Sequence, residues 1–177
     1  MGTYLLTKEL LRYSHKRIYI LEGSYEFSNA RERFEGFRLA MKEGGINVDH
    51  NYEYRFEGDF TEESGFNGVV HMINHFNQKP TAILCTNNAM LIGALKALHK
   101  YHISIPEQIS IVGFNGIDNL ELMNIRPTVA NFDPYQIGSA TGKFLLERIQ
   151  NLNIENREAI FDPTLINGNA TSFPRIF

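Results

Sequence analysis

Short apolar runs alternate with longer amphipathic segments along the first two thirds of the chain. The runs have the length and the β-rich composition of strands, and they are Arg17–Leu21, Tyr52–Phe56, Ala82–Thr86 and Ile109–Gly113. Between them apolar residues recur at steps of three and four, as Phe34, Phe37 and Met41 do, which predicts helices with one buried face. Strands regularly separated by such helices predict an α/β fold, a doubly wound parallel sheet with helices on both faces.

The last third of the chain has a different pattern. Thr128–Phe132 is a further strand candidate, and Pro134 suits the first turn of a helix that runs to Gln150. Two short strand candidates follow near Ala159–Phe161 and Leu165–Ile166. No internal repeat or linker divides the chain, so we treat residues 1–177 as one unit.

The predicted topology indicates where a ligand would bind. In doubly wound sheets, ligands lie beyond the carboxyl ends of the strands. Four loops follow the predicted strands, namely Gly23–Arg31, Gly58–Thr61, Thr86–Asn88 and Phe114–Ile117. These loops are the first place to look for binding residues.

Composition narrows the class of protein. A formal net charge of −3 does not favour a nucleic-acid-binding module, which normally has a basic face. The one cysteine, Cys85, lies in an apolar run, which predicts an inert core thiol and no internal disulfide. We expect a cytoplasmic protein, because we find neither a signal peptide nor a membrane-spanning stretch.

Chemical motifs do not favour an enzyme. Gly138–Lys143 lacks the glycine spacing of a phosphate-binding loop and falls within a predicted helix. His71 and His75 share a helix face, but without an obvious third ligand we interpret them as surface or interface histidines. We expect no catalytic residue, no metal and no cofactor.

Four sequence blocks resemble the LacI/GalR family of bacterial transcriptional regulators. They follow the order and spacing of that family, and they are Ser28–Phe37, Gly58–Gly65, Pro80–Leu95 and Ile105–Ile117. The resemblance covers nearly the whole chain. It implies the small-molecule-sensing part of a DNA-binding repressor.

The resemblance also implies a domain organisation. Residues 16–127 and 155–177 would form the C-terminal lobe of an effector-binding core like that of type I periplasmic binding proteins. Helices 3–13 and 134–150 would belong to an incomplete N-terminal lobe, which leaves apolar residues such as Leu6, Leu10, Phe144 and Leu145 without their sheet. DNA would be bound through a head that this chain does not contain.

The resemblance assigns ligand contacts to Arg31, Phe60, Asn87 and Asn115, all in the four loops. Arginine offers a fork of donors, phenylalanine stacks on a sugar or base, and asparagine both donates and accepts. Alternatives remain open, since each of the four has a structural explanation as a surface, core or turn residue. We interpret Asn88 as a helix cap or secondary contact. Asn88 and Asn115 stand where the family often has aspartate, which disfavours a cationic ligand.

The expected partners are a small hydroxylated effector, most simply a sugar, and a second copy of the chain. Family members dimerise partly through the C-terminal lobe, which points here to the helices beginning at Thr61 and Ala89 and to Leu120–Ile125. The alternative function is a sugar-binding protein for transport or chemotaxis, which would need an export signal.

Overall fold

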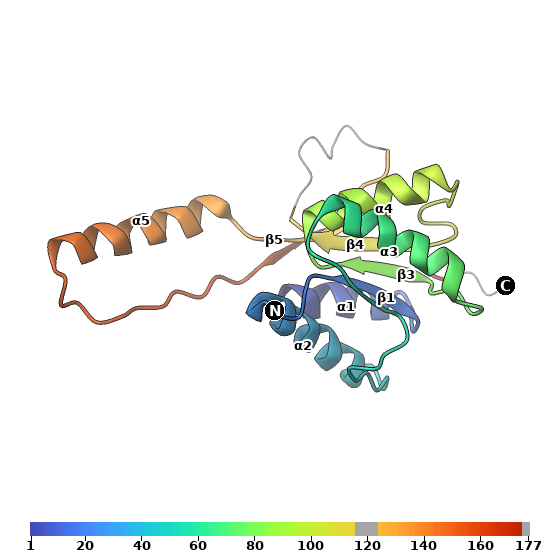
Figure 1. Ribbon diagram of the computed structural model, residues 1–177, viewed down its shortest axis with the longest axis horizontal. Helices are drawn as coiled ribbons and strands as arrows, with labels where there is room; N and C mark the ends of the chain where they lie inside the picture. Colours follow the sequence, from blue (N-terminus) through green and yellow to red (C-terminus); the bar gives the residue numbers. More distant parts are fainter. Residues whose placement is uncertain (116–123, 175–177) are drawn as a thin grey trace.

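The structure is a computed structural model that describes residues 1–115 and 124–174 (Figure 1). Its centre is a six-stranded sheet with the strand order β2-β1-β3-β4-β5-β6. Five strands run parallel: β1 (Ile18–Glu22), β2 (Arg55–Glu57), β3 (Ala82–Cys85), β4 (Ser110–Phe114) and β5 (Thr128–Asn131). The edge strand β6 (Thr164–Ile166) pairs antiparallel with β5.

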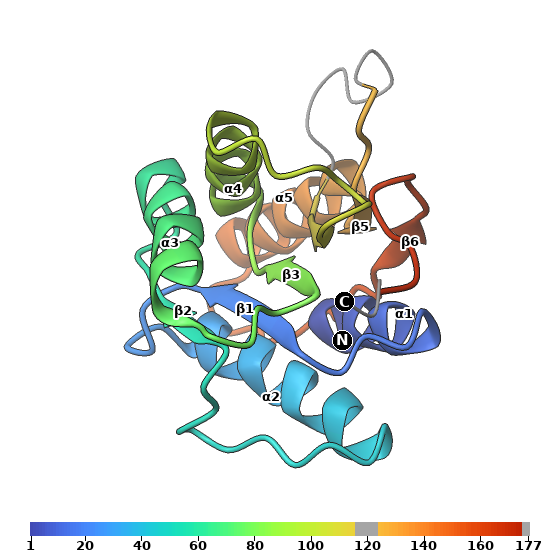
Figure 2. The same ribbon diagram turned by 90° about the vertical axis from the view of Figure 1, so that its right-hand side faces the viewer.

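Helices cover both faces of the sheet, as the doubly wound prediction requires (Figure 2). One face is covered by α1 (Gly2–Arg12) and α2 (Ser28–Glu43), and the other by α3 (Glu62–His75) and α4 (Asn88–Lys100). Strand side chains alternate between these layers. Ile18 and Ile20 face α1 and α2, whereas Tyr19 and Leu21 face α3 and α4.

Two glycines let α3 and α4 approach closely. A Cβ atom on Gly93 would lie 1.9 Å from the Glu62 carbonyl oxygen, and one on Gly65 would lie 2.2 Å from the Met90 carbonyl oxygen. Contacts this short leave no room for a side chain at either position. The two helices therefore begin side by side at the same edge of the sheet, where β1 and β3 end.

The structure corrects the expectation for the first helix. Leu6 and Leu10 of α1 are fully buried and pack in the same core cluster as Ile20 and Phe37. The helix therefore covers the sheet of this lobe, and its apolar residues have not lost a partner. The physical reason is that α1 connects directly to β1 and can fold back onto the strand that follows it.

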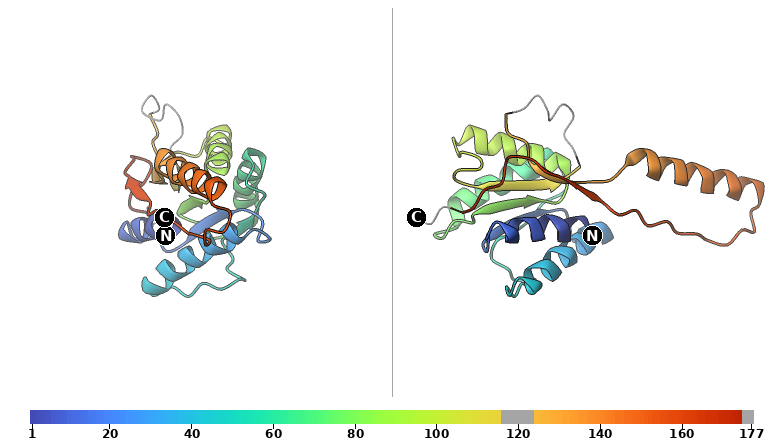
Figure 3. Two further views of the ribbon diagram at one scale, coloured as in Figure 1. Left: turned by 90° about the vertical axis from the view of Figure 1, so that its left-hand side faces the viewer. Right: turned by 180° about the vertical axis from the view of Figure 1, so that it is seen from behind.

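The helix at 134–150 lies apart from the rest of the fold. Helix α5 (Pro134–Gln150) projects away from the sheet with the irregular segment that returns from it (Figures 1 and 3). None of its residues is buried, and Leu145, Leu146 and Ile149 are about 60% exposed. An apolar side this open is typical of a surface that another structural element covers.

The segment after α5 differs in part from the prediction. Ala159–Phe161 is not a strand, and the strand near Leu165–Ile166 is β6. The sequence pattern did not predict that β6 is antiparallel to β5. Helix α5 lies between these strands but does not pack across the sheet, so it makes no crossover connection. Most of Leu120–Ile125 and the end of the Phe114–Ile117 loop lie outside the described residues.

Candidate functional site

The carboxyl ends of the parallel strands carry a group of aromatic and polar side chains. Phe60 is central to it and half-buried, with a backbone φ of 66°. A left-handed conformation at a bulky residue is strained, and it persists only where the surroundings hold it. The Phe60 carbonyl oxygen accepts a hydrogen bond of 2.7 Å from the Asn87 side-chain amide, and Asp59 accepts from the Thr61 backbone and hydroxyl.

A glycine makes room for the Phe60 ring. A Cβ atom on Gly23, directly after β1, would lie 2.2 Å from two ring carbons of Phe60. The ring therefore lies across the end of β1. Phe27 lies nearby, with a distance of 6.3 Å between the two ring centroids.

Arg33 is the cationic residue that packs against the rings of this group. Its guanidinium carbon lies 5.5 Å from the ring centroid of Phe60 and 4.7 Å from that of Phe114, at the end of β4. It donates one hydrogen bond of 2.9 Å to the Thr86 carbonyl oxygen, after β3. Among the described residues no carboxylate forms a salt bridge with Arg33, so a half-buried cation keeps free donors. Burial lowers the pKa of its guanidinium, and Glu32 opposes this effect.

Arg31 does not join this group, which corrects the prediction. Its guanidinium donates to the carbonyl oxygens of Tyr25 and Glu26 at 2.8 and 2.7 Å, and so it holds the loop before α2. Residues two apart on a helix point in nearly opposite directions, so only one of the two arginines can face the strand ends. The sequence spacing favours Arg33, because Arg33 lies four positions before Phe37 and therefore on the buried face of α2.

The helix cap after β3 is Asn87 and not Asn88, which corrects the expected cap. Asn87 is the N-cap of α4, because its side-chain oxygen accepts from the Met90 backbone N–H at 2.9 Å. Its side-chain amide donates to the Phe60 carbonyl oxygen, so Asn87 holds the Phe60 backbone in place. Asn88, expected as the cap, is the first residue of the helix and is exposed.

Asn115 follows β4 and is exposed, with a backbone φ of 54°. Asparagine tolerates this left-handed conformation better than most residues. Its backbone N–H donates to Ala130 at 3.0 Å, which holds it at the strand end next to Phe114. Arg33, Phe60, Asn87 and Asn115 therefore gather at one edge.

A buried ion pair that sequence reasoning missed supports this edge. Glu22, at the end of β1, is fully buried and forms an ion pair with Arg55 of β2. Burial raises the pKa of Glu22 to about 7, although Arg55 acts to lower it. Arg55 in turn packs over the rings of Tyr25 and Phe34. No sequence motif predicts this ion pair, because Glu22 follows an apolar run and would be expected to lie in an exposed loop.

The small pocket beside Arg33 has a volume of about 190 Å³. Its lining comes from the starts of α1 and α2 and from the ends of β4 and β5, and includes Thr3, Asn29, Glu32, Phe114 and Phe132. The site is therefore a shallow polar surface with aromatic walls, suited to hold one side of a ligand.

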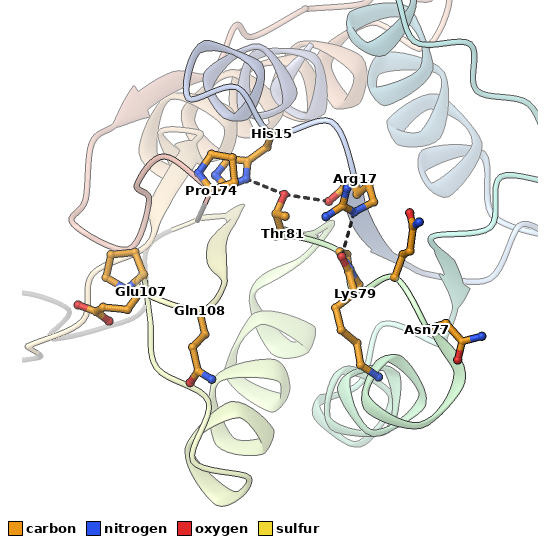
Figure 4. A pocket seen from close by; sticks show the side chains of 11 residues that line it. His15, Arg17, Asn77, Lys79, Thr81, Glu107, Gln108 and Pro174 are labelled. Carbon is orange, nitrogen blue, oxygen red and sulfur yellow. Dashed lines mark hydrogen bonds between the residues drawn. The ribbon is translucent and has the colours of Figure 1, made fainter. Parts of the chain in front are cut away.

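A larger pocket of about 480 Å³ lies at the opposite, amino ends of the strands (Figure 4). Its buried ionisable side chain is His15, whose Nε2 donates to the Ser172 carbonyl oxygen at 2.8 Å, while its Nδ1 accepts from the Thr81 hydroxyl at 2.9 Å. Burial lowers the pKa of His15 to about 4. The histidine thus joins the starts of β1 and β3 to the C-terminal segment, and its bonds explain its burial.

The described residues show no arrangement of three or more His, Cys, Asp or Glu side chains that could hold a metal ion. Within the same residues, no helix is long and apolar enough to cross a membrane.

Comparison with known proteins identifies the family. Residues 7–171 match the periplasmic binding protein-like domain, and the chain belongs to this family. Within it, the similar proteins are regulators of the LacI family, which confirms the resemblance seen in the sequence blocks. The repressor PurR of Vibrio vulnificus, an HTH-type transcriptional repressor, is 32% identical over 165 residues, which are 93% of this chain and 48% of that protein.

Solved structures of LacI-family regulators share the fold of this chain. A putative LacI transcriptional regulator from Bacillus cereus subsp. cytotoxis superposes with a TM-score of 0.87 at 26% identity, covering 98% of this chain and 62% of the other. A sugar-binding LacI-family regulator from Escherichia coli, complexed with phosphate, gives 0.80 at 25% identity, covering 98% and 61%. The chain spans about half the length of the curated relatives it matches.

Proposed function

We propose that this chain is the effector-binding part of a DNA-binding transcriptional repressor, and that its strand-end surface binds a small hydroxylated metabolite. Ligand binding would alter operator binding by favouring one arrangement of the repressor over another. The names of the relatives support a regulator over the alternative, a sugar-binding protein for transport or chemotaxis, and over an enzyme.

The observation that carries the proposal is the position of Arg33 beside Phe60. A half-buried guanidinium with free donors suits ligand oxygens, and the ring next to it can stack on a flat apolar face. Both side chains lie at the carboxyl edge of the sheet, where ligands bind in this class of fold. We therefore place Arg33, in exchange for Arg31, in the binding surface with Phe60 and Asn115.

The chemistry of the surface favours a neutral, oxygen-rich effector such as a sugar. Asn88 and Asn115 provide amides without negative charge, and hydrogen bonds between amides and hydroxyl groups work in both directions. A purine base is the second candidate class, because Phe60 can stack on it equally well. Asn87 acts indirectly by holding the Phe60 backbone.

The effector would lie between this lobe and a second lobe. The exposed apolar side of α5 supports this proposal, because it would pack into that second lobe together with residues beyond this chain. We also propose that copies associate through the outer surfaces of α3 and α4. The net charge of −3 favours DNA contact through other residues of the repressor.

The test compares two neighbouring arginines by NMR titration. Amide shifts of the 177-residue chain are followed while sugars and purine bases are added to millimolar concentrations. This lobe forms only one side of the proposed binding cleft, so we expect weak binding, with a dissociation constant near 1 mM or a binding free energy of about −4 kcal/mol. Arg33→Ala should abolish the shifts around Phe60, because the free donors are lost, whereas Arg31→Ala should preserve them. Equal loss in both variants, or shifts confined to the opposite end of the sheet, would refute the proposal.

A further inference from the structure

Two histidines lie four positions apart in the last two turns of α3. His71 is half-buried against Phe56 and Phe76, and His75 is exposed. Their rings are stacked, with centroids 4.0 Å apart and planes inclined by 14°. Neither side chain takes part in the strand-end surface described above.

Hydrogen bonds determine which nitrogen of each ring is free. His75 Nδ1 lies 3.0 Å from the His71 carbonyl oxygen, which can only accept, so Nδ1 carries the proton. His71 Nδ1 lies 2.9 Å from the Tyr19 hydroxyl, which itself donates to the Gly68 carbonyl oxygen at 3.0 Å. When the Tyr19 hydroxyl gives its one proton to Gly68, His71 Nδ1 is the donor to the hydroxyl oxygen. Both rings therefore present a lone pair at Nε2, and neither Nε2 has a hydrogen-bond partner among the described residues.

This arrangement is what a metal-binding histidine pair requires. Histidines that bind metal typically donate their other ring N–H to a carbonyl or another oxygen, which fixes the tautomer and the ring orientation. Here one of these oxygens belongs to Tyr19, which is fully buried and therefore a firm anchor. A cation at this position also lies at the C-terminal end of α3, where the helix dipole favours positive charge.

We propose that His71 and His75 form a binding site for a divalent transition-metal ion of the Cu²⁺, Ni²⁺ or Zn²⁺ type. The two Nε2 atoms occupy two coordination positions at about 2.0–2.1 Å, and water occupies the others. Because the stacked rings are nearly parallel, their in-plane lone pairs run side by side, and the His75 ring rotates to bring its Nε2 onto the ion held by His71. His75 has the freedom to do so because it is exposed. A bound ion joins the last two turns of α3 and stabilises the end of the helix.

Calorimetry and thermal unfolding of the untagged chain test the site. Imidazole ligands favour Cu²⁺ over Ni²⁺ and Zn²⁺ and do not select Mg²⁺, so we expect binding in that order and none for Mg²⁺. Each ion that binds should raise the midpoint of unfolding. His75→Ala should weaken Cu²⁺ binding by about tenfold or more, because a single imidazole remains.

The other histidines provide the matched control. His99 and His102 are exposed and lie at the end of α4, so the His99→Ala/His102→Ala double variant should bind Cu²⁺ like the unchanged protein. Nitrogen-15 NMR of the imidazoles should show both His71 and His75 protonated at Nδ1 before metal is added. Unchanged Cu²⁺ affinity in His75→Ala, loss of binding in the double variant, or protonation at Nε2 would each overturn the proposal.

Discussion

Two buried groups give this protein opposite responses to pH between about 4.5 and 6.5. His15 is 1% exposed with a pKa of about 4, below its ordinary value of 6.5. Its contribution to stability is complete above pH 6.5 and is lost as the pH falls toward 4, because only the unfolded chain takes up the proton. Glu22 is fully buried with a pKa of about 7, above its ordinary value of 4.5. Protonated Glu22 therefore favours the folded state at low pH, and its contribution to stability is lost as the pH rises from 4.5 to 7.

The magnitudes are similar. A tenfold change in proton affinity corresponds to about 1.36 kcal/mol, so each group contributes about 3 kcal/mol across its window. The stability of the unchanged protein should therefore vary little from pH 4.5 to 6.5, since the two effects oppose each other. His15→Gln should become more stable as the pH falls through this range, and Glu22→Gln should become less stable.

The assay is urea unfolding followed by circular dichroism at several pH values, since the chain has no tryptophan. The informative quantity is the slope of the unfolding free energy against pH, because each substitution also changes the stability itself through lost hydrogen bonds. Slopes of the same sign in both variants would show that burial at His15 and Glu22 does not govern the response.

Three further substitutions test the packing at the site and the core. Gly23→Ala should displace the Phe60 ring, which a Cβ atom would approach to 2.2 Å, and should cost about 1–3 kcal/mol in thermal unfolding while weakening the NMR response to ligand. Asn87→Ala should cost about 1 kcal/mol or more in urea unfolding, because the cap of α4 and the bond to Phe60 are both lost, whereas Asn88→Ala should change stability by less than about 0.5 kcal/mol. Leu10→Ala should cost about 2–5 kcal/mol, since its side chain is fully buried, and a cost near zero would show that α1 does not belong to this core.

The sequence pattern was sufficient for the fold class. The alternation of β-rich runs and amphipathic helices predicted the parallel sheet, because such strands and helices each have an apolar face to bury and only a few layered arrangements bury them all. It also predicted the edge at which Phe60, Asn87 and Asn115 gather, because parallel strands place their following loops together. The family resemblance agreed with both conclusions.

Local chemistry and tertiary contacts were harder to foresee. Arg31 and Arg33 fit the same sequence block, and although the spacing of Arg33 from Phe37 favours Arg33, only the structure shows that Arg31 is bound to its own loop while Arg33 packs at the strand ends. Asn87 caps α4, although Asn88 was equally suitable by residue type. The hydrogen bond from the Asn87 amide to the Phe60 carbonyl oxygen fixes the Asn87 side chain in the capping position.

The amino-acid sequence by itself determined the order and type of the elements and the edge of the sheet at which the loops after the parallel strands gather, because periodicity and connection length act locally. Only the tertiary structure decided that α1 belongs to this core, that α5 leaves it, and that Glu22 and His15 are buried ionisable groups. These features depend on contacts between segments distant in the chain, and the free energy of burying a side chain is set by neighbours that no local pattern specifies.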